Sequence, residues 1–131
     1  MRLLLDTHTF LWHAEGNPKL SAVAAAALSD PANDLYLSLA SVWELAIKVG
    51  LRKLSFSRPF LPFVPDALRR FRILDLPISL DDCEGYRQLP FPDPKHRDPF
   101  DRMIITHALR NRLSIVGCDV AFDAYGVPCL W

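Results

Sequence analysis

The chain begins with a short apolar run, Arg2 to Leu5, that stops at a carboxylate, Asp6. An apolar run of this length predicts a buried β-strand. Open α/β sheets bind their ligands at the carboxyl ends of their strands, so Asp6 lies where such a sheet would hold a functional group. A buried carboxylate must be hydrogen-bonded, paired or metal-bound, because its isolated burial is costly. The alternative is that Asp6 caps the next helix.

Strands and helices are predicted to alternate along the whole chain. The expected strands are 2–5, 35–39, 72–76, 114–116 and 127–130. The expected helices are 22–28, 42–49, 80–89 and 98–112, with a short helix around 10–12, a proline-broken segment at 59–71 and a short helix at 120–125. This order predicts an α/β fold with a parallel central sheet and helices on both faces. With 131 residues, 50% of them hydrophobic, we expect a single domain, 1–131.

Three more acids lie at comparable boundaries: Glu44, Asp101 and Asp119. Each also has a structural explanation. Ser41 and Glu44 have the spacing of a capping box, Asp98 and Asp101 fit the cap and first turn of a helix, and Asp119 could cap the segment after it. Four carboxylates at one edge of a sheet would repel each other unless a cation lies among them. Mg²⁺ and Mn²⁺ prefer such oxygen ligands, so we assign Asp101 to the metal and Asp98 to the cap, with a role beside the metal as the alternative for Asp98.

A metal site of this kind suits hydrolysis of phosphodiester bonds. Bound metal ions lower the pKa of water and stabilise charge on the leaving oxygen. A nucleophile with a paired base is not apparent, since Ser38 and Ser41 lack a His–Asp pattern and a thiolate at Cys118 is disfavoured beside Asp119. The three cysteines show no CxxC spacing, which argues against zinc and disulfides and for a reducing compartment.

The charge balance excludes some classes of protein. With 15 basic and 15 acidic residues the formal net charge is zero, so bulk charge alone does not hold nucleic acid to this chain. A nuclease with a basic rim stays compatible with that balance. Asp6 and His8 interrupt the apolar start, which makes it too short for a signal peptide, and no stretch is long enough to cross a membrane. We therefore expect a cytoplasmic protein with no membrane contact.

Four segments together resemble a known family: LLLDTHTFLW (3–12), SVWELAIK (41–48), HRDPFDRMII (96–105) and DVAFDAYGV (119–127). In this order the chain resembles the PIN-domain ribonucleases of the VapC toxin type over nearly its whole length. The resemblance implies a PIN-like three-layer sandwich and a Mg²⁺- or Mn²⁺-dependent endoribonuclease. It further implies the toxin of a toxin–antitoxin pair, a homodimer and neutralisation by a small antitoxin. It places the catalytic and metal-binding acids on Asp6, Glu44, Asp101 and Asp119.

The resemblance fails at one position. Many members of the family have Thr or Ser two residues before the last acid, where this chain has Gly117. If that hydroxyl supports Asp119, its absence weakens the site, and Gly117→Thr should raise activity at limiting metal, provided that the strand end tolerates a Cβ. The alternatives are a catalytically weak PIN-fold module that binds RNA or protein, and a haloacid-dehalogenase-type phosphatase. The phosphatase chemistry needs a second acid two residues after Asp6, where this chain has His8.

Basic and apolar residues are candidates for substrate and partner contacts. Arg102, Lys48 and His8 are the preferred candidates for substrate binding, Arg102 above all because it adjoins Asp101. For any single basic residue an ordinary solvated charge is the better explanation, and for His8 a structural role explains the residue equally well. The proposed basic rim for phosphates comprises Lys48, Arg52, Lys53, Lys95, His96, Arg97 and Arg102. Apolar residues beyond the needs of a small core suggest a dimer interface: Leu11, Trp12, Trp43, Leu45 and Val49.

Overall fold

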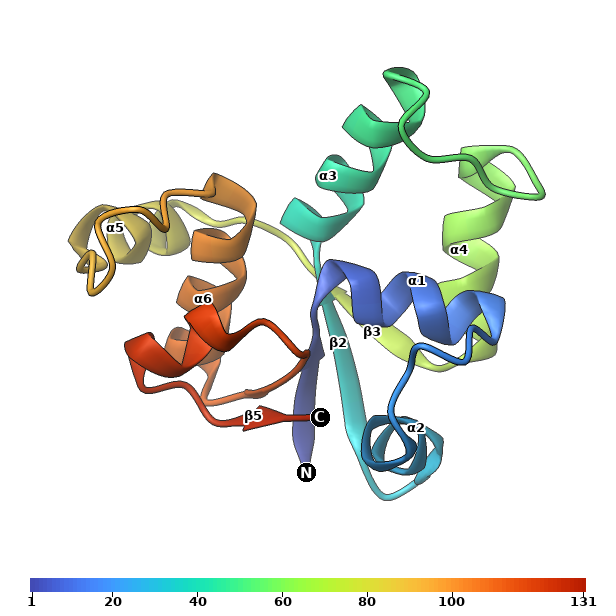
Figure 1. The fold of residues 1–131 in the computed structure, drawn as a ribbon, viewed down its shortest axis with the longest axis horizontal. Coiled ribbons are helices and arrows are strands. Elements are labelled where there is room, and N and C mark those ends of the chain that lie inside the picture. The colour runs from blue at the N-terminus through green and yellow to red at the C-terminus, as the bar shows by residue number, and fades with distance from the viewer.

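A computed structural model describes all residues, 1–131, and shows one five-stranded sheet between two layers of helices (Figure 1). The strands are β1 (Arg2–Leu5), β2 (Asp34–Ser38), β3 (Ile73–Leu76), β4 (Ser114–Val116) and β5 (Cys129–Leu130). The helices are α1 (Thr7–Glu15), α2 (Ala22–Ser29), α3 (Leu39–Gly50), α4 (Phe60–Arg70), α5 (Leu80–Gln88), α6 (Pro99–Asn111) and the 3₁₀ helix η1 (Val120–Tyr125). All strand pairs are parallel, in the order β3-β2-β1-β4-β5. The predicted fold class is confirmed.

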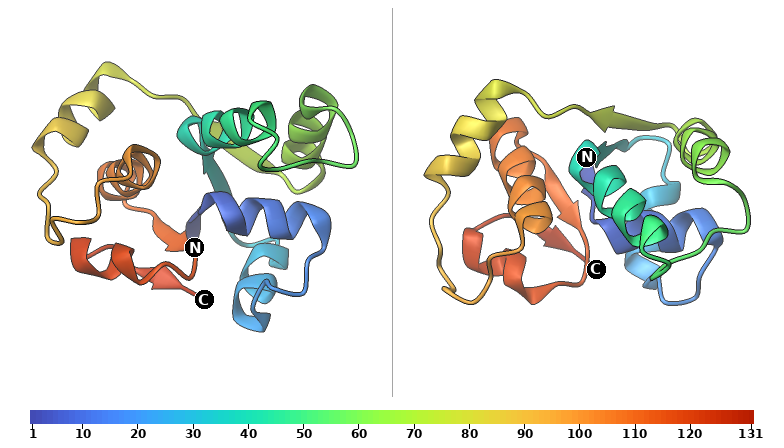
Figure 2. Two further views of the ribbon diagram at one scale, coloured as in Figure 1. Left: turned by 45° about the horizontal axis from the view of Figure 1, so that its top comes forward. Right: turned by 90° about the horizontal axis from the view of Figure 1, so that it is seen from above.

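The central strand is β1, and its apolar side chains pack into hydrophobic cores on both faces of the sheet. Leu3, Leu4 and Leu5 are fully buried. Leu3 and Leu5 join a core with residues of α1, α2, α3 and α4, while Leu4 joins a core with residues of α6 and η1. Successive side chains of a strand point to opposite faces, so three consecutive leucines are what a doubly covered strand requires. Figure 2 shows these two groups of helices on opposite sides of the sheet.

The start of α3 differs from the prediction. The helix begins at Leu39 and is capped by Ser38, whose side chain accepts a hydrogen bond from the Ala40 amide at 3.0 Å. Ser41 is buried inside the helix, where its Oγ accepts a bond from Thr7 Oγ1 at 2.9 Å. The capping box predicted for Ser41 and Glu44 is therefore wrong. From the local sequence, either Ser38 or Ser41 could cap the helix. Ser38 pairs with Leu76 as the last residue of β2, so the extended chain ends there and the helix starts at the next residue.

Two other predictions change. Residues 60–70 form a continuous helix instead of a broken one, since Pro59 precedes it and Pro62 lies in the first turn, where no intrahelical amide bond is lost. Only Pro65 is interior. At the end of the chain, β5 covers Cys129–Leu130 and is shorter than expected. The cap predicted at Asp98 is confirmed, because its Oδ1 accepts from the amides of Phe100 and Asp101 at 2.9 and 3.0 Å.

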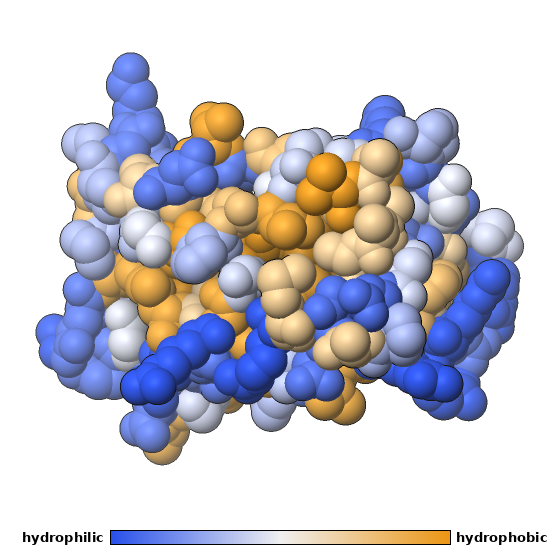
Figure 3. Space-filling view, turned by 90° about the horizontal axis from the view of Figure 1, so that it is seen from below, coloured by the Kyte–Doolittle hydropathy of each residue, from blue (hydrophilic) through white to orange (hydrophobic).

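The carboxyl ends of the strands and their amino ends form two different surfaces. Figure 3 views the end at which the chain termini lie, and apolar residues gather there in the middle of a hydrophilic border. The four predicted acids follow the opposite ends of the strands or lie in the helices next to them. No helix of the structure is long and apolar enough to cross a membrane.

Candidate metal centre

The four acids surround the point where the chain changes direction across the sheet. From β1 the chain proceeds to β2 on one side, and it later returns to β4 on the other side (Figure 1). Open parallel sheets bind ligands at such a point, outside the carboxyl ends of the strands. Asp6 directly follows β1, and Asp119 follows β4 after two residues. The connectivity therefore places both carboxylates at the expected edge.

Asp6 is a buried acid without a cationic partner. It is 8% exposed, and its amide, not its carboxylate, joins the sheet by donating to the Val116 carbonyl at 3.0 Å. Its side chain forms no cap bond to α1, so the capping alternative does not apply. Burial is the main cause that raises the pKa of Asp6 to about 7, and the nearby charges of Asp101, Glu44 and Asp119 contribute to this rise, while a backbone hydrogen bond at Thr7 opposes it. The pKa thus reports both the burial of this carboxyl and the convergence of the four acids.

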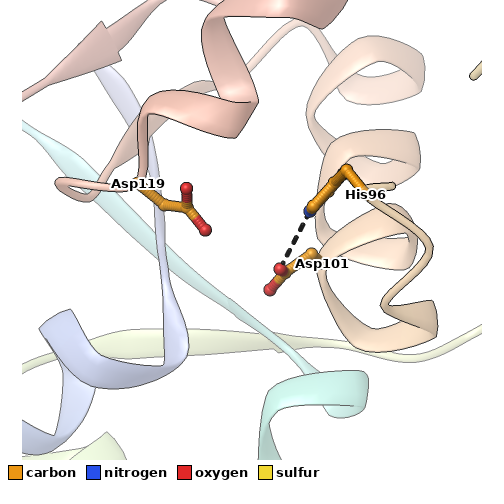
Figure 4. Close-up of side chains that lie close together, drawn as sticks. All are labelled: His96, Asp101 and Asp119. Atoms are coloured by element: carbon orange, nitrogen blue, oxygen red, sulfur yellow. Dashed lines mark hydrogen bonds and ion pairs between the residues drawn. The ribbon is translucent and has the colours of Figure 1, made fainter. Parts of the chain in front are cut away.

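Asp101 and Asp119 face each other with His96 beside them (Figure 4). One ligand atom from each of these three residues lies within 4.8 Å of the other two. Burial raises the pKa of Asp101 to about 6, with Asp98 and Asp119 adding to the rise and the hydrogen bond from His96 opposing it. Asp119 is exposed and caps η1 through Oδ1, which accepts from the Ala121 amide at 2.9 Å. Its second oxygen is not needed for that cap, so capping and metal binding are compatible.

Glu44, Lys48 and His8 lie together next to this cluster. Glu44 is close enough to raise the pKa of Asp6, and its Oε2 forms an ion pair with Lys48 Nζ at 3.3 Å. His8 and Lys48 line a groove between α1 and α3. Partial burial lowers the pKa of His8, and Lys48 lowers it further. The structure thus brings Glu44 to the acids and leaves Lys48 and His8 at their border.

Arg102 does not belong to the basic rim, and that prediction is corrected. The side chain is buried at 2% exposure, although its neighbour Asp101 faces the site. Its guanidinium donates to the carbonyl oxygens of Pro90 and Leu89 at 2.8 and 2.9 Å, and it lies 3.7 Å from the centroid of the Phe91 ring. A buried guanidinium that donates to two carbonyls and packs against an aromatic ring has a structural role and is not available to RNA phosphates.

His96 has a role that the sequence reasoning missed. The sequence pattern places it in the basic rim for phosphates, yet its side chain is only 12% exposed and its Nε2 lies 3.1 Å from Asp101 Oδ2. The proline-rich loop before α6 brings it back to the first turn of that helix, across a sequence separation of five residues. The one local indication is that a histidine precedes the helix cap Asp98 by two residues.

Gly117 is needed for its small size. A Cβ built on this residue would lie 2.9 Å from Asp6 Cβ and 3.5 Å from an Asp6 carboxylate oxygen. Its backbone conformation is ordinary, so contact with Asp6, not backbone strain, is what favours glycine here. Where family members have a hydroxyl, this chain lets β4 approach Asp6 more closely than a larger side chain would permit. The expectation that Gly117→Thr raises activity is therefore replaced by its opposite.

We expect Gly117→Ala and Gly117→Thr to displace Asp6 and to weaken Mn²⁺ binding. Changes beside a metal ligand typically cost about 10–100-fold in metal affinity, and isothermal titration with Mn²⁺ would measure the loss. Gly50→Ala is the matched control, because a Cβ at Gly50 meets nothing within 4 Å. Unchanged Mn²⁺ affinity in both Gly117 variants would contradict the close-contact explanation.

The donor set fits a divalent cation. Asp6 is buried among acids, and no cationic side chain lowers its pKa. The carboxylate oxygens of Asp6, Glu44, Asp101 and Asp119 are hard ligands of the kind Mg²⁺ and Mn²⁺ prefer. A bound cation would relieve the mutual repulsion that raises the pKa values of Asp6 and Asp101.

Comparison with known proteins agrees with the sequence resemblance. The sequence model described as PIN domain matches residues 3–128. Ribonuclease VapC16 from Mycobacterium tuberculosis is 41% identical over 58 residues, and this match covers 41% of each chain. The chain thus spans less than half the length of this curated relative.

Solved structures extend the likeness over the whole fold. A chain in the structure of VapBC2 from Rickettsia felis, bound to a DNA fragment from its promoter, superposes with a TM-score of 0.74 at 16% identity, covering 98% of this chain and 97% of that one. A chain of VapBC-1 from nontypeable Haemophilus influenzae gives 0.67 at 21% identity, with coverages of 98% and 96%. At these identities the superpositions show a shared fold.

Proposed function

The chain belongs to the PIN domain family, and from this premise we propose that it is a metal-dependent endoribonuclease acting as the toxin of a toxin–antitoxin pair. The observation that supports the proposal most directly is the buried carboxyl of Asp6, which has no ion-pair partner. It lies among three other acids at the carboxyl ends of β1 and β4, from which the chain continues to opposite sides of the sheet. The curated relative that is 41% identical over 58 residues is named a ribonuclease. The haloacid-dehalogenase alternative is set aside, since the family match covers nearly the whole chain.

We propose that Asp6, Glu44, Asp101 and Asp119 hold Mg²⁺, or Mn²⁺ in its place. A metal ion in such a site lowers the pKa of the attacking water and stabilises negative charge on the leaving oxygen. The four carboxylates would bind and orient the ion, and the hydrogen bond from the Asp6 amide to the Val116 carbonyl of β4 holds Asp6 in place. Lys48, at the border of the acids, is the candidate contact for the RNA phosphates.

The proposed partners are RNA, a small antitoxin and a second copy of this chain. The structural neighbours include VapBC complexes, which supports the antitoxin proposal. Two residues expected at the dimer interface, Leu11 and Leu45, are buried within the single chain and are withdrawn from it. Trp43 remains a candidate, because it is 61% exposed and borders an apolar groove with Phe100. Light scattering on the purified protein would measure its oligomeric state.

RNA cleavage by the purified protein tests the proposal. We expect end-labelled RNA to be cut in Mg²⁺ or Mn²⁺ and to stay intact when a chelator removes the metal. Asp123→Asn is the control variant, since Asp123 is an exposed acid of η1 outside the cluster. Cutting that persists in chelator would overturn the metal mechanism. RNA or antitoxin binding without cleavage would instead support the alternative of a binding module.

A further inference from the structure

We infer that His96 is a positioning residue for Asp101, and that Tyr125 and Arg102 hold its imidazole in a single tautomer. Its consequence for catalysis rests on the proposed function, whereas the hydrogen bonds themselves do not. The arrangement itself is a chain of three hydrogen bonds, from Arg102 to Tyr125 to His96, that ends on a carboxylate of the metal centre. Figure 4 shows its last link, between His96 and Asp101. Each link has a direction that can be worked out from the atoms involved.

The direction begins at Arg102, which can only donate. Its NH1 group donates to the Tyr125 hydroxyl oxygen at 3.2 Å. The hydroxyl hydrogen of Tyr125 is then free to point at Nδ1 of His96, 3.0 Å away. At the other end of the chain the ionised Asp101 carboxylate can only accept, so the proton of a neutral His96 lies on Nε2 and Nδ1 accepts from the Tyr125 hydroxyl. Nε2–H in turn donates to Asp101 Oδ2 at 3.1 Å.

The chain starts from a rigid group. Arg102 is buried and donates to the carbonyls of Leu89 and Pro90, which fixes the position of its guanidinium. Tyr125 ends η1, and its ring packs edge-on against His96 with centroids 5.7 Å apart. A side chain from the proline-rich loop is thereby fixed to α6 and η1. Asp101 gains a donor whose position is set by the folded core.

The consequence is that the two oxygens of Asp101 have different tasks. Oδ2 accepts from His96, which leaves Oδ1 for a cation. Outer partners of this kind orient a ligand, and their loss typically costs about 10–100-fold in metal affinity or activity. His96 as a direct metal ligand is the competing arrangement, since its Nε2 also lies close to Asp101 and Asp119. That arrangement needs a free lone pair on Nε2 and hence the opposite tautomer, which would leave the Tyr125 hydroxyl hydrogen without its acceptor.

Nuclear magnetic resonance distinguishes the two arrangements in the full chain without RNA. Long-range ¹H–¹⁵N spectra at about pH 8, where histidine is ordinarily neutral, report which ring nitrogen carries the proton. We expect protonated Nε2 for His96, and we expect it to remain so in saturating Mg²⁺. Tyr125→Phe should mix the two tautomers. A proton on Nδ1, or loss of the Nε2 proton when Mg²⁺ is added, would overturn the inference in favour of direct ligation.

Metal affinity supplies a second readout that is independent of RNA cleavage. We expect His96→Ala and Tyr125→Phe each to weaken Mn²⁺ binding by about 10–100-fold. His96→Gln retains an amide donor and should recover most of the affinity. Tyr86→Phe is the control, because the Tyr86 ring also lies beside Arg102 but its hydroxyl forms no hydrogen bond in the structure. Parental Mn²⁺ affinity in Tyr125→Phe, or a His96→Gln variant no better than His96→Ala, would refute the positioning role. Failure of RNA cleavage alone would bear on the proposed function instead.

Discussion

Asp6→Asn is expected to abolish RNA cleavage while the fold stays intact, and Asp101→Asn is expected to do the same. Each substitution preserves the shape of the side chain and removes one negative charge from the metal centre. The loss of cleavage rate should be larger than the loss of about 10–100-fold that is typical for changes beside a metal ligand. Cleavage rates of end-labelled RNA in Mg²⁺ would measure it, with circular dichroism to confirm folding. Mg²⁺-dependent cleavage at the parental rate in either variant would remove that acid from the site.

The stability of the metal-free protein provides an independent check on Asp6. The pKa of Asp6 is raised to about 7 in the folded state, above its value in the unfolded chain. Between about pH 4 and pH 7 the folded state therefore binds more protons than the unfolded state, and the free energy of unfolding falls as the pH rises through this window. An asparagine at position 6 cannot ionise, so the Asp6→Asn variant does not undergo this loss of stability as the pH rises. Above pH 7, in chelator, Asp6→Asn should be more stable than the parent by on the order of 2–4 kcal/mol.

Urea unfolding at both ends of this pH window would measure the difference. The gain should shrink to a small remainder near pH 4, where the carboxyl of the parent is protonated in the folded state and about half protonated in the unfolded chain. Added Mg²⁺ should stabilise the parent and not Asp6→Asn, since only the parent retains the full set of acids. An Asp6→Asn variant that is less stable than the parent at pH 8 without metal would show that Asp6 is not held uncompensated in the fold.

Arg102→Met is expected to destabilise the fold strongly instead of weakening RNA binding alone. Methionine fills a similar volume but leaves the carbonyls of Leu89 and Pro90 and the hydroxyl of Tyr125 without their donor. A buried polar group left unsatisfied costs roughly 1–3 kcal/mol. The bond to Leu89 is buried and those to Pro90 and Tyr125 are partly buried, so we expect a loss of about 2 kcal/mol or more in the free energy of unfolding, measured by urea denaturation.

Arg97→Met is the matched control for this prediction. Arg97 also donates to a carbonyl, that of Pro94, and also lies over the Phe91 ring, but it is exposed. Its replacement should change the stability by no more than about 0.5 kcal/mol. Full stability of Arg102→Met together with weakened RNA binding would restore Arg102 to the basic rim.

The acids of the site were predictable because each lies at a boundary that local sequence defines. Asp6 ends an apolar run, and Asp101 follows the Asp98 cap by three residues. Strand hydrophobicity and cap chemistry act over a few residues, and the parallel order of strands then brings their carboxyl ends to one edge. For Glu44 the competing structural explanation, a capping box with Ser41, does not hold, since the cap of α3 is Ser38. The likeness to the PIN family supplied what local spacing did not.

The sequence by itself determined the α/β fold, the buried central strand and the positions of the acids, because hydrophobic period and capping are properties of short segments. Tertiary structure alone decided the roles of Arg102, His96 and Gly117. Consecutive helix residues face different sides, so Arg102 enters the core although Asp101 beside it faces the site. His96 acquires its partner through a loop that returns to α6, and Gly117 meets Asp6 across two neighbouring strands. Contacts of this kind depend on where segments pack, which no local pattern specifies.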